Sequence, residues 1–337
     1  MSKASVIIFT YNQAGYICQA LEGACRQTIK PLEIIVVDDA STDSTFDIAT
    51  KWILERADPL VSIVRNKVNM GLVASVSTWA SQSKGDIVIP MAGDDISDPR
   101  RVEQVMRHFA ANPLSYALVA SGETIDKEGQ LIGAYGNGLD RSITMATCEP
   151  RSGDFLNNLG ATGASAAYRR EVFTQFPPMN KDAFAEDRIL CFRALLLGAC
   201  DFSSENHVRW RRHEANLSRD TRGERNAALA IHFNRCAAMV QQHLDDLAHV
   251  DGSLAGKKKL LEMGLRYQHA RWRLWSEAND SGIPANRFLT AWREMRSCAP
   301  GLICLMRDSL RPALHLLTPF VVRQALARYL CGSAQRP

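Results

Sequence analysis

Several features that would place this 337-residue chain in a special class are missing from its sequence. It has no uncharged apolar run of about 18 residues or more, so we expect no membrane-spanning helix. Its beginning, MSKASVIIFTYNQ, lacks the apolar core of a secretory signal. Its nine cysteines are scattered without a C-x-x-C pair, which disfavours both a disulfide framework and a zinc site. These absences favour a cytoplasmic globular protein with reduced thiols.

The formal net charge of +4 hides an uneven distribution. Residues 1–205 hold 19 Lys and Arg against 25 Asp and Glu, whereas residues 206–337 hold 21 against 11. Nucleic acid binds to basic surfaces, whereas the first part of this chain is acidic, so we do not expect nucleic acid as a partner. The basic last part suits anionic lipid or a phosphorylated acceptor, although a solvated surface has the same composition.

The first half of the sequence alternates β-rich runs with helical patterns, which is typical of a parallel sheet. The runs are rich in Val and Ile along their whole length, as expected for strands that are covered on both faces. Ser44 is a candidate cap for the second helix. The predicted strands are residues 5–10, 33–38, 61–65 and 86–90, and the predicted helices are residues 14–27, 44–57, 72–83 and 100–112.

The pattern changes after residue 115. A hairpin is predicted over 127–130, a strand within 163–170, and long helices over 224–250 and 256–278. We therefore predict an α/β domain over residues 1–220, with halves of about 1–115 and 116–220, and a helical region over 221–337. The shift in charge and the loss of strand patterning put the boundary near 215–225.

Ligands of open α/β sheets bind beyond the carboxyl ends of the strands. The loops that leave such ends here are TYNQAG, DDASTDST, RNKVNMG and MAGDD. Asp38 and Asp39 end the second strand and can accept hydrogen bonds from ribose hydroxyls or a base N–H. Thr10, Tyr11 and Asn12 would lie beside them. An Asx turn before the next helix explains the aspartate pair equally well.

Asp94 and Asp95 follow the fourth predicted strand. Hard divalent cations take one or two carboxylates and fill their shell with water and substrate phosphates. The pair therefore suits a site from which a nucleoside diphosphate departs, and Gly93 would let the backbone approach that diphosphate closely. From this loop alone, Asp95 is an equally good candidate for the cap of the next helix.

Other charged segments fit the same chemistry. Glu186 and Asp187 begin a predicted helix, where they either favour the helix dipole or supply a general base. The segment VRWRRHEANLS places Arg211 and Arg212 beside His213. These cations either form an exposed basic strand or neutralise a phosphate.

Together these segments resemble glycosyltransferase family 2, whose members are inverting enzymes with the GT-A fold. The resemblance covers about residues 4–218 and follows an ordered series of motifs: residues 4–45, 66–95, 163–173, 185–198 and 210–218. It implies an α/β fold of the nucleotide-diphospho-sugar transferase type, which is Rossmann-like. Such a fold has a mostly parallel central sheet flanked by helices, and here a helical carboxy-terminal extension would follow.

The resemblance also implies a role for each candidate residue. The nucleotide-side residues would be Thr10, Tyr11, Asn12, Asp38, Asp39, Gly71 and Asp94. Asp95 and His213 would hold Mn²⁺ or Mg²⁺, and Arg211 and Arg212 would lie on the phosphate side. Asp187, with Glu186 beside it, would be the general base, while His213 would help the diphosphate to leave. The family commonly has Asp-x-Asp-Asp where this chain has Ala92-Gly93-Asp94-Asp95, which implies a cation held by one carboxylate with diphosphate and water.

The implied reaction is a single displacement that moves a sugar from a nucleotide-sugar to an acceptor hydroxyl. The first candidate for this donor is a UDP-sugar. The acceptor would be a glycan or a lipid-linked molecule of bacterial surface polysaccharide synthesis. A sugar nucleotidyltransferase would instead need a Gly-rich basic loop after the first strand, and TYNQAGY lacks one. A receiver domain would need a later phosphoacceptor Asp. A catalytically impaired relative that only binds nucleotide stays open because of Ala92.

The last part of the helical region, residues 300–330, mixes Arg with Leu, Val and Phe at helical spacing. Such a helix can lie on the inner face of a membrane, pack against the catalytic domain or form a dimer. Trp272 and Trp275 are predicted to pack between helices. The sequence does not indicate the oligomeric state.

Overall fold

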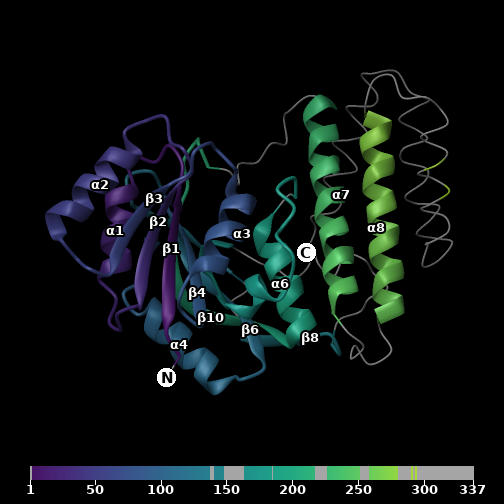
Figure 1. Ribbon diagram of the computed structural model, residues 1–337, viewed down its shortest axis with the longest axis horizontal. Coiled ribbons are helices and arrows are strands. Elements are labelled where there is room, and N and C mark those ends of the chain that lie inside the picture. The colour runs from purple at the N-terminus through teal and green to yellow at the C-terminus, as the bar shows by residue number, and fades with distance from the viewer. Residues whose placement is uncertain are drawn as a thin grey trace.

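The computed structural model describes residues 2–136, 140–147, 163–183, 185–216, 226–250 and 258–279, together with Thr290 and Arg293. Within these residues one sheet has helices on both of its faces, and the long helices α7 and α8 lie beyond one of the helical layers (Figure 1). The order of strands in the sheet is β3-β2-β1-β4-β9-β6-β10-β5, with β7 added to β6 and β8 to β10.

The first half of the sheet is parallel. It contains β1 (Ala4–Thr10), β2 (Glu33–Asp38), β3 (Val61–Arg65) and β4 (Ile87–Ala92), which confirms the four strands that the Val and Ile runs predicted. The pairs β1–β2, β1–β4 and β2–β3 all run in the same direction. The carboxyl ends of all four strands therefore meet at one edge of the sheet.

The second half of the sheet is mixed. It contains β5 (Ile96–Ser97), β6 (Ser115–Ile125), β9 (Ala166–Arg169) and β10 (Ala199–Arg211). Strand β9 is antiparallel to both β4 and β6, while β6 and β10 are parallel to each other. Strands β7 (Leu131–Tyr135) and β8 (Arg141–Thr144) lie off the main order, and the β6–β7 pair confirms the predicted hairpin.

Two hydrophobic cores hold the layers together. Helices α1 (Ile17–Cys25), α2 (Thr45–Arg56) and α4 (Arg101–Ala111) bury one core against the sheet. Helices α3 (Leu72–Gln82), α5 (Glu171–Thr174) and α6 (Glu186–Leu197) bury the other. Successive residues of β1 point to opposite faces, so Val6 and Ile8 enter the first core and Ile7 and Phe9 enter the second. This explains why successive positions in the middle of β1 and β2 are apolar and do not alternate with polar residues.

The predicted cap of α2 is only half right. Ser44 occupies the cap position, but within the described residues its side chain makes no capping hydrogen bond. Asp43 Oδ1 instead accepts a hydrogen bond from Thr45 N at 2.9 Å. The carboxylate one residue earlier therefore satisfies the first N–H of the helix, whereas a capping serine would accept from the second or third.

Helices α7 (Asn226–His249) and α8 (Lys258–Asn279) pack against each other, and α7 also contacts α6. Trp272 stacks on Phe233 with ring centroids 5.6 Å apart, and Trp275 meets the same ring edge-on at 5.4 Å. This confirms that the two tryptophans pack between helices. The last strand ends at Arg211 and α7 begins at Asn226, while the division into domains at residue 220 stays a prediction.

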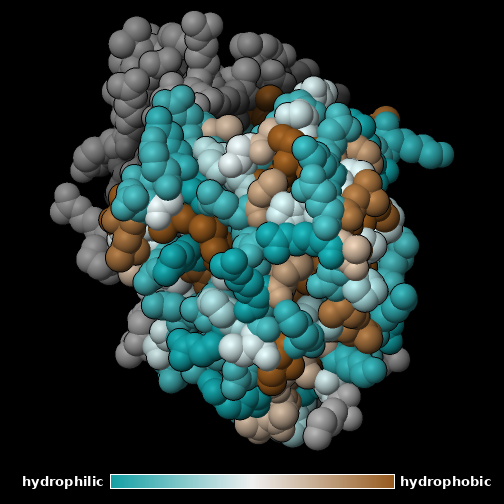
Figure 2. Space-filling model, turned by 90° about the vertical axis from the view of Figure 1, so that its left-hand side faces the viewer, coloured by the Kyte–Doolittle hydropathy of each residue, from teal (hydrophilic) through white to brown (hydrophobic). Residues whose placement is uncertain are grey.

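The predicted membrane-contacting segment, residues 300–330, lies outside the described residues. Among the described helices, none is both long and apolar enough to cross a membrane. Viewed from the side of α1 and α2, the surface is mostly hydrophilic, and its hydrophobic residues form separate patches (Figure 2). Scattered apolar groups of this kind are normal on protein surfaces.

Candidate functional site

The predicted nucleotide-side loops meet where the parallel strands end. Thr10 lies opposite Asp38 in the β1–β2 register, and Asp38 lies opposite Arg65 in the β2–β3 register. On the other side of β1, Phe9 lies opposite Ala92, just before the aspartates of the β4 loop. The structure thus brings together residues that are far apart in the sequence.

Thr10 and Asn12 brace the loop that follows β1. The buried Thr10 hydroxyl donates a hydrogen bond to Gln13 Oε1 at 2.9 Å. Asn12 has a left-handed backbone, with φ of 53°, and its Oδ1 accepts a hydrogen bond from Thr42 N at 2.8 Å. Tyr11 is 41% exposed. Asn12 is exposed as well, so of the three predicted residues on this loop only Thr10 is buried.

Asp38 is fully buried at the end of β2. Its Oδ2 accepts a hydrogen bond from Ser41 N at 3.0 Å, three residues on, so it stabilises the turn after β2 but does not form the Asx turn, which spans two residues. The same oxygen lies 3.2 Å from Arg65 Nε. Its Oδ1 is a buried atom without a hydrogen-bond partner in the described part of the chain. Asp38 therefore shapes the turn and keeps one unused acceptor.

Asp39 is satisfied by the segment that enters α3. Its Oδ1 accepts hydrogen bonds from Asn66 Nδ2 at 2.7 Å, Met70 N at 2.9 Å and Ser75 Oγ at 3.0 Å. Its Oδ2 accepts one from Gly71 N at 2.8 Å. Gly71 has φ of 80°, a conformation that favours glycine, so its role in this turn is local geometry. A nucleotide that contacts Asp39 would have to share a carboxylate that the protein already uses.

The loop after β4 carries the predicted cation ligands. A Cβ on Gly93 would lie 2.6 Å from Gln13 Oε1 and 2.7 Å from Thr10 Oγ1, so only glycine fits against the β1 loop. Asp95 is 1% exposed, and its Oδ1 accepts a hydrogen bond from Arg211 N at 2.9 Å. Its Oδ2 is a buried atom without a hydrogen-bond partner among the described residues. Burial and the neighbouring Asp94 raise the pKa of Asp95 well above its usual range.

Asp95 does not cap the next helix. The acid at the start of α4 is Asp98, whose Oδ1 accepts a hydrogen bond from Arg100 N at 2.8 Å. This excludes the alternative that the β4 loop left open. Asp95 is instead directed toward the end of β10.

His213 contacts Asp94, the residue predicted on the nucleotide side, rather than Asp95. Its Nε2 lies 2.9 Å from Asp94 Oδ2, and its Nδ1 accepts a hydrogen bond from Ala215 N at 3.3 Å. Because Nδ1 is the acceptor, Nε2 carries the proton and donates it toward the carboxylate. The ring of Tyr16 lies against the imidazole, with centroids 4.9 Å apart.

Arg211 departs from the role that its sequence context suggested. Its side chain is fully buried, with Nε donating to the carbonyl of Asp94 at 2.8 Å and Nη1 to that of Asp126 at 3.1 Å. Its Nη2 donates to Gln19 Oε1. Each nitrogen is therefore used inside the protein, and Arg211 organises the loops instead of facing a phosphate. Arg212 is exposed, with its guanidinium carbon 5.6 Å from the Trp210 ring centroid.

Glu186 and Asp187 occupy the first turn of α6 and face the short helix η2 (Gly163–Ser165). Asp187 Oδ2 accepts a hydrogen bond from Gly163 N at 3.1 Å. A Cβ on Gly163 would lie 2.8 Å from Glu186 Oε1, so both carboxylates meet at this glycine. Burial and the charge of Asp187 raise the pKa of Glu186 to about 8. Burial also raises the pKa of Asp187, although Arg188 opposes the shift.

The donor atoms after β4 fit a hard divalent cation. Asp95 Oδ2 is an orphaned acceptor, whereas the predicted ligand His213 uses Nε2 on Asp94 and Nδ1 on Ala215 N, so in this arrangement it offers a cation no free nitrogen. Within the described residues, no group of three or more His, Cys, Asp and Glu side chains could hold a metal ion. The protein would therefore supply few ligands, as Mg²⁺ and Mn²⁺ sites on diphosphates do, and the diphosphate and water would complete the shell.

The sequence did not single out Gln13 or Gly163. Gln13 forms the wall that excludes a side chain at position 93, and Gly163 donates to the candidate base. The signal for Gln13 was weak, because a glutamine in a loop has no distinctive chemistry. Gly163 is the first residue of the family-like motif over residues 163–173. A glycine at this place before a strand indicates close packing.

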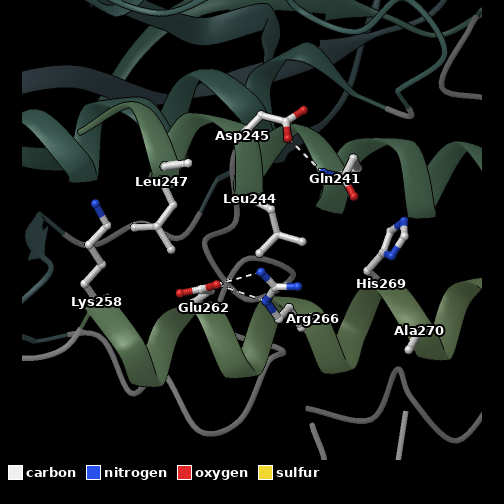
Figure 3. Close-up of a pocket in the computed structure, with 10 residues that line it drawn as sticks. Gln241, Leu244, Asp245, Leu247, Lys258, Glu262, Arg266, His269 and Ala270 are labelled. Carbon is white, nitrogen blue, oxygen red and sulfur yellow. Dashed lines mark hydrogen bonds and ion pairs between the residues drawn. The ribbon is translucent and has the colours of Figure 1, made fainter. Parts of the chain in front are cut away.

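A groove between α7 and α8 is separate from these residues (Figure 3). Its walls carry pairs that lie within one helix, such as Glu262 with Arg266 at 2.8 Å and Gln241 with Asp245 at 2.8 Å. None of the predicted site residues lines it. The groove therefore gives no support to a binding role.

Comparison with solved structures identifies the class of fold. The S. aureus TarS fragment 1–349 in complex with UDP-GlcNAc matches with a TM-score of 0.63 at 18% identity, over 98% of this chain and 92% of that fragment. The mannosyltransferase PcManGT from Pyrobaculum calidifontis, in complex with GDP-Man and Mn²⁺, matches with a TM-score of 0.51 at 19% identity, over 99% and 87%. The fold is thus GT-A, as the sequence predicted.

The sequence comparisons identify the family. EpsE of Bacillus subtilis (strain 168), a protein described as a glycosyltransferase, is 34% identical over 132 residues. The aligned part spans 39% of this chain and about half of EpsE, at 47%. The model of glycosyl transferase family 2 matches residues 5–176, just over half of the chain. This protein belongs to that family.

Proposed function

We propose that this protein transfers a sugar from a nucleotide-sugar, with a UDP-sugar as the first candidate, to a hydroxyl of a glycan or lipid-linked acceptor. The observation that carries the proposal is the presence of two acidic centres around η2 and the end of β4. Asp94 and Asp95 with His213 form one centre, and Glu186 with Asp187 forms the other. The first suits a diphosphate with its cation, and the second suits a hydroxyl that must lose a proton. The UDP-GlcNAc of TarS and the GDP-Man and Mn²⁺ of PcManGT support this class of donor and cation.

Asp187 is the proposed general base. With its pKa raised to about 8 by burial and by the charge of Asp187, Glu186 holds its proton at neutral pH. Gly163 N and Arg188 favour the charge on Asp187. Asp187 takes the proton of the acceptor hydroxyl, whose oxygen forms a bond to the anomeric carbon. The bond from that carbon to the diphosphate oxygen breaks on the opposite face, and the configuration inverts.

The other centre holds the leaving group. Asp95 would hold Mn²⁺ or Mg²⁺ through its unpartnered Oδ2, with the Asp94–His213 pair beside the diphosphate, and a bound cation would supply neutralisation of the charge that grows on the diphosphate. Arg212, exposed beside Trp210, is the remaining candidate for a phosphate contact. Arg211 fixes the geometry, since it bonds to the Asp94 carbonyl through Nε and to Asp95 through its main-chain N–H.

Calorimetry with UDP tests the donor side. We expect binding that depends on Mn²⁺ and that Asp95→Ala loses this dependence. A protein that binds no UDP with any divalent ion would overturn the donor assignment.

The Asp187→Asn variant tests the base. It should abolish transfer and leave UDP affinity nearly intact, while retained turnover would mean that another residue is the base. The sugar would then be identified by testing a panel of nucleotide sugars. For each one, its hydrolysis or the rise in the Tm of the protein is measured.

A further inference from the structure

Arg101, at the start of α4, is a buried cation whose hydrogen bonds go to main-chain carbonyls. Its side chain is 1% exposed, and its Nη2 donates to the carbonyls of Pro90, Ala164 and Ala166, each at 3.1 Å. Its Nε and Nη1 are buried without hydrogen-bond partners among the described residues. Burial lowers the pKa of Arg101 to about 10, so the side chain stays charged at neutral pH. Unsatisfied buried groups of this kind are rare in proteins and require an explanation.

The explanation begins with Pro90 in β4. Strands β4 and β9 are antiparallel and pair at Ile87–Arg169 and Val88–Tyr168. The same register would next place Pro90 opposite Ala166, but proline has no N–H to donate to the ladder. The pair of Pro90 and Ala166 therefore lacks the hydrogen bond that an N–H at residue 90 would donate to the Ala166 carbonyl. Arg101 Nη2 donates to both carbonyls and takes the place of that pairing.

The carbonyls that Arg101 joins belong to the two acidic centres. Pro90 leads through the end of β4 at Ala92 to Asp94 and Asp95. Ala164 lies in η2, next to Gly163, whose N–H donates to Asp187 at 3.1 Å. A single nitrogen atom thus lies between the strand that carries the candidate cation ligands and the turn that holds the candidate base.

We propose that Arg101 is a positioning residue for sugar transfer, which fixes the distance between the cation loop after β4 and the carboxylates at the start of α6. The effect on catalysis rests on the proposed function. The contacts of Arg101 with the three carbonyls are independent of that function. A lysine cannot replace Arg101, because its side chain is one atom shorter, so its ammonium falls short of the Nη2 position from which all three carbonyls are contacted. The substitution should shift η2 and Asp187 relative to Asp94 without removing any group that contacts the nucleotide.

Arg101→Lys tests the proposal, with Arg169→Lys as the matched control. Arg169 also donates to three carbonyls, those of Ser115 at 2.7 Å, Phe109 at 3.0 Å and Asn112 at 3.4 Å, but it lies at the other end of β9. For Arg101→Lys we expect at least about a tenfold fall in kcat for UDP-GlcNAc hydrolysis, a 1.4 kcal/mol change in barrier, with the Kd for UDP within about threefold of wild type. Arg169→Lys should leave both values near wild type. Equal kcat values in wild type and folded Arg101→Lys would overturn the proposal, as would equal losses in the two variants.

A second measurement does not depend on activity. The amide of Gly163, followed by hydrogen exchange in NMR spectra, should exchange at least about tenfold faster in Arg101→Lys than in Arg169→Lys. Unchanged protection of this amide would overturn the proposal. If wild type neither binds UDP nor hydrolyses UDP-GlcNAc, the proposed function fails, whereas the exchange of Gly163 still decides whether Arg101 positions η2.

The outcome in which Arg101→Lys does not fold is also decisive. Arg101→Gln then takes its place under the same criteria, since glutamine removes the buried charge and keeps an NH₂ group for the carbonyls. If neither variant folds while Arg169→Lys does, Arg101 is a requirement of the fold, and the positioning role is overturned.

Discussion

Asp94 Oδ2 and His213 Nε2 lie 2.9 Å apart, although the two residues are separated by 119 positions in the chain. The contact joins the loop after β4 to the segment after β10. The candidate cation centre is therefore built from both halves of the α/β unit. Neither half contains it alone.

His213→Ala should weaken UDP binding in the presence of Mn²⁺ by about tenfold, which corresponds to 1.4 kcal/mol. The substitution leaves Asp94 without the N–H that orients its carboxylate. Titration calorimetry measures the effect. His108→Ala is the control, because His108 Nε2 lies 3.0 Å from Asp201 Oδ2 in a similar pair between α4 and β10. A loss of affinity of the same size in both variants would contradict a specific role for His213.

Stability should depend on pH through Glu186. Its pKa rises from an ordinary 4.5 to about 8 through burial and the charge of Asp187. The folded protein thus keeps a proton that the unfolded chain releases, so this group's contribution to the free energy of unfolding falls between pH 4.5 and 8 and is constant above that range.

Glu186→Gln cannot ionise and should remove this dependence. The Tm of the variant relative to wild type should be higher at pH 8.5 than at pH 5.5, as measured by scanning calorimetry. Glu262→Gln, at an exposed position of α8, serves as the control and should show the same Tm difference at both pH values. A Tm difference for Glu186→Gln that does not change with pH would show that the carboxyl is not perturbed.

Gly93→Ala should damage the donor side. The added Cβ would meet Gln13 Oε1 at 2.6 Å and Thr10 Cβ at 2.7 Å, so the β4 loop must move away from β1. We expect UDP affinity to fall by at least about tenfold. Gly15→Ala, in the same β1 loop, meets nothing within 4 Å and should bind UDP as wild type does. Wild-type affinity in Gly93→Ala would mean that the loop tolerates the shift.

Asp246→Asn should destabilise the packing of α7 on α6. Arg193 Nε lies 2.8 Å from Asp246 Oδ2, and both side chains are buried, so the substitution leaves a buried charge without its partner. We expect a loss of about 3–5 kcal/mol in the free energy of unfolding, measured in urea. The double variant Arg193→Met, Asp246→Leu should recover much of this loss, because it removes both charges.

The exposed pair Glu262–Arg266 on α8 provides the comparison. Its N–O distance is also 2.8 Å, but its side chains are 42% and 59% exposed. Glu262→Gln should therefore change stability by less than about 1 kcal/mol. Equal effects at the buried and exposed pairs would show that burial of Arg193 and Asp246 does not govern their contribution.

The sequence predicted most of the first half of the fold. Continuous runs such as EIIVVD in β2 require cover on both faces, and short helices between such runs require parallel strands. That topology in turn predicted that Thr10 and Asp38 share one edge of the sheet, which the register confirms. Hydrophobic pattern and connection length carry this information locally.

The contacts within the site could not be predicted in the same way. Strand β5 has two residues, too few for a periodic pattern, yet its pairing of Ser97 with Val208 helps bring the end of β10 to Asp95. The burial of Arg211 and the contact of His213 with Asp94 follow from that long-range pairing. A string of Arg and His residues indicates charge, but only the folded sheet determines which of them face inward.

The late arrival of β10 has a consequence for synthesis of the chain. Strands β1 to β4 are complete at Ala92, so the parallel half of the sheet can form while the ribosome is still adding residues. The Asp95 carboxylate cannot accept its hydrogen bond from Arg211 N until that residue, 116 positions later in the chain, has been synthesised. A nascent chain can therefore form the carboxyl edge of strands β1 to β4 first, and it completes the contacts of the loop after β4 only when β10 has emerged.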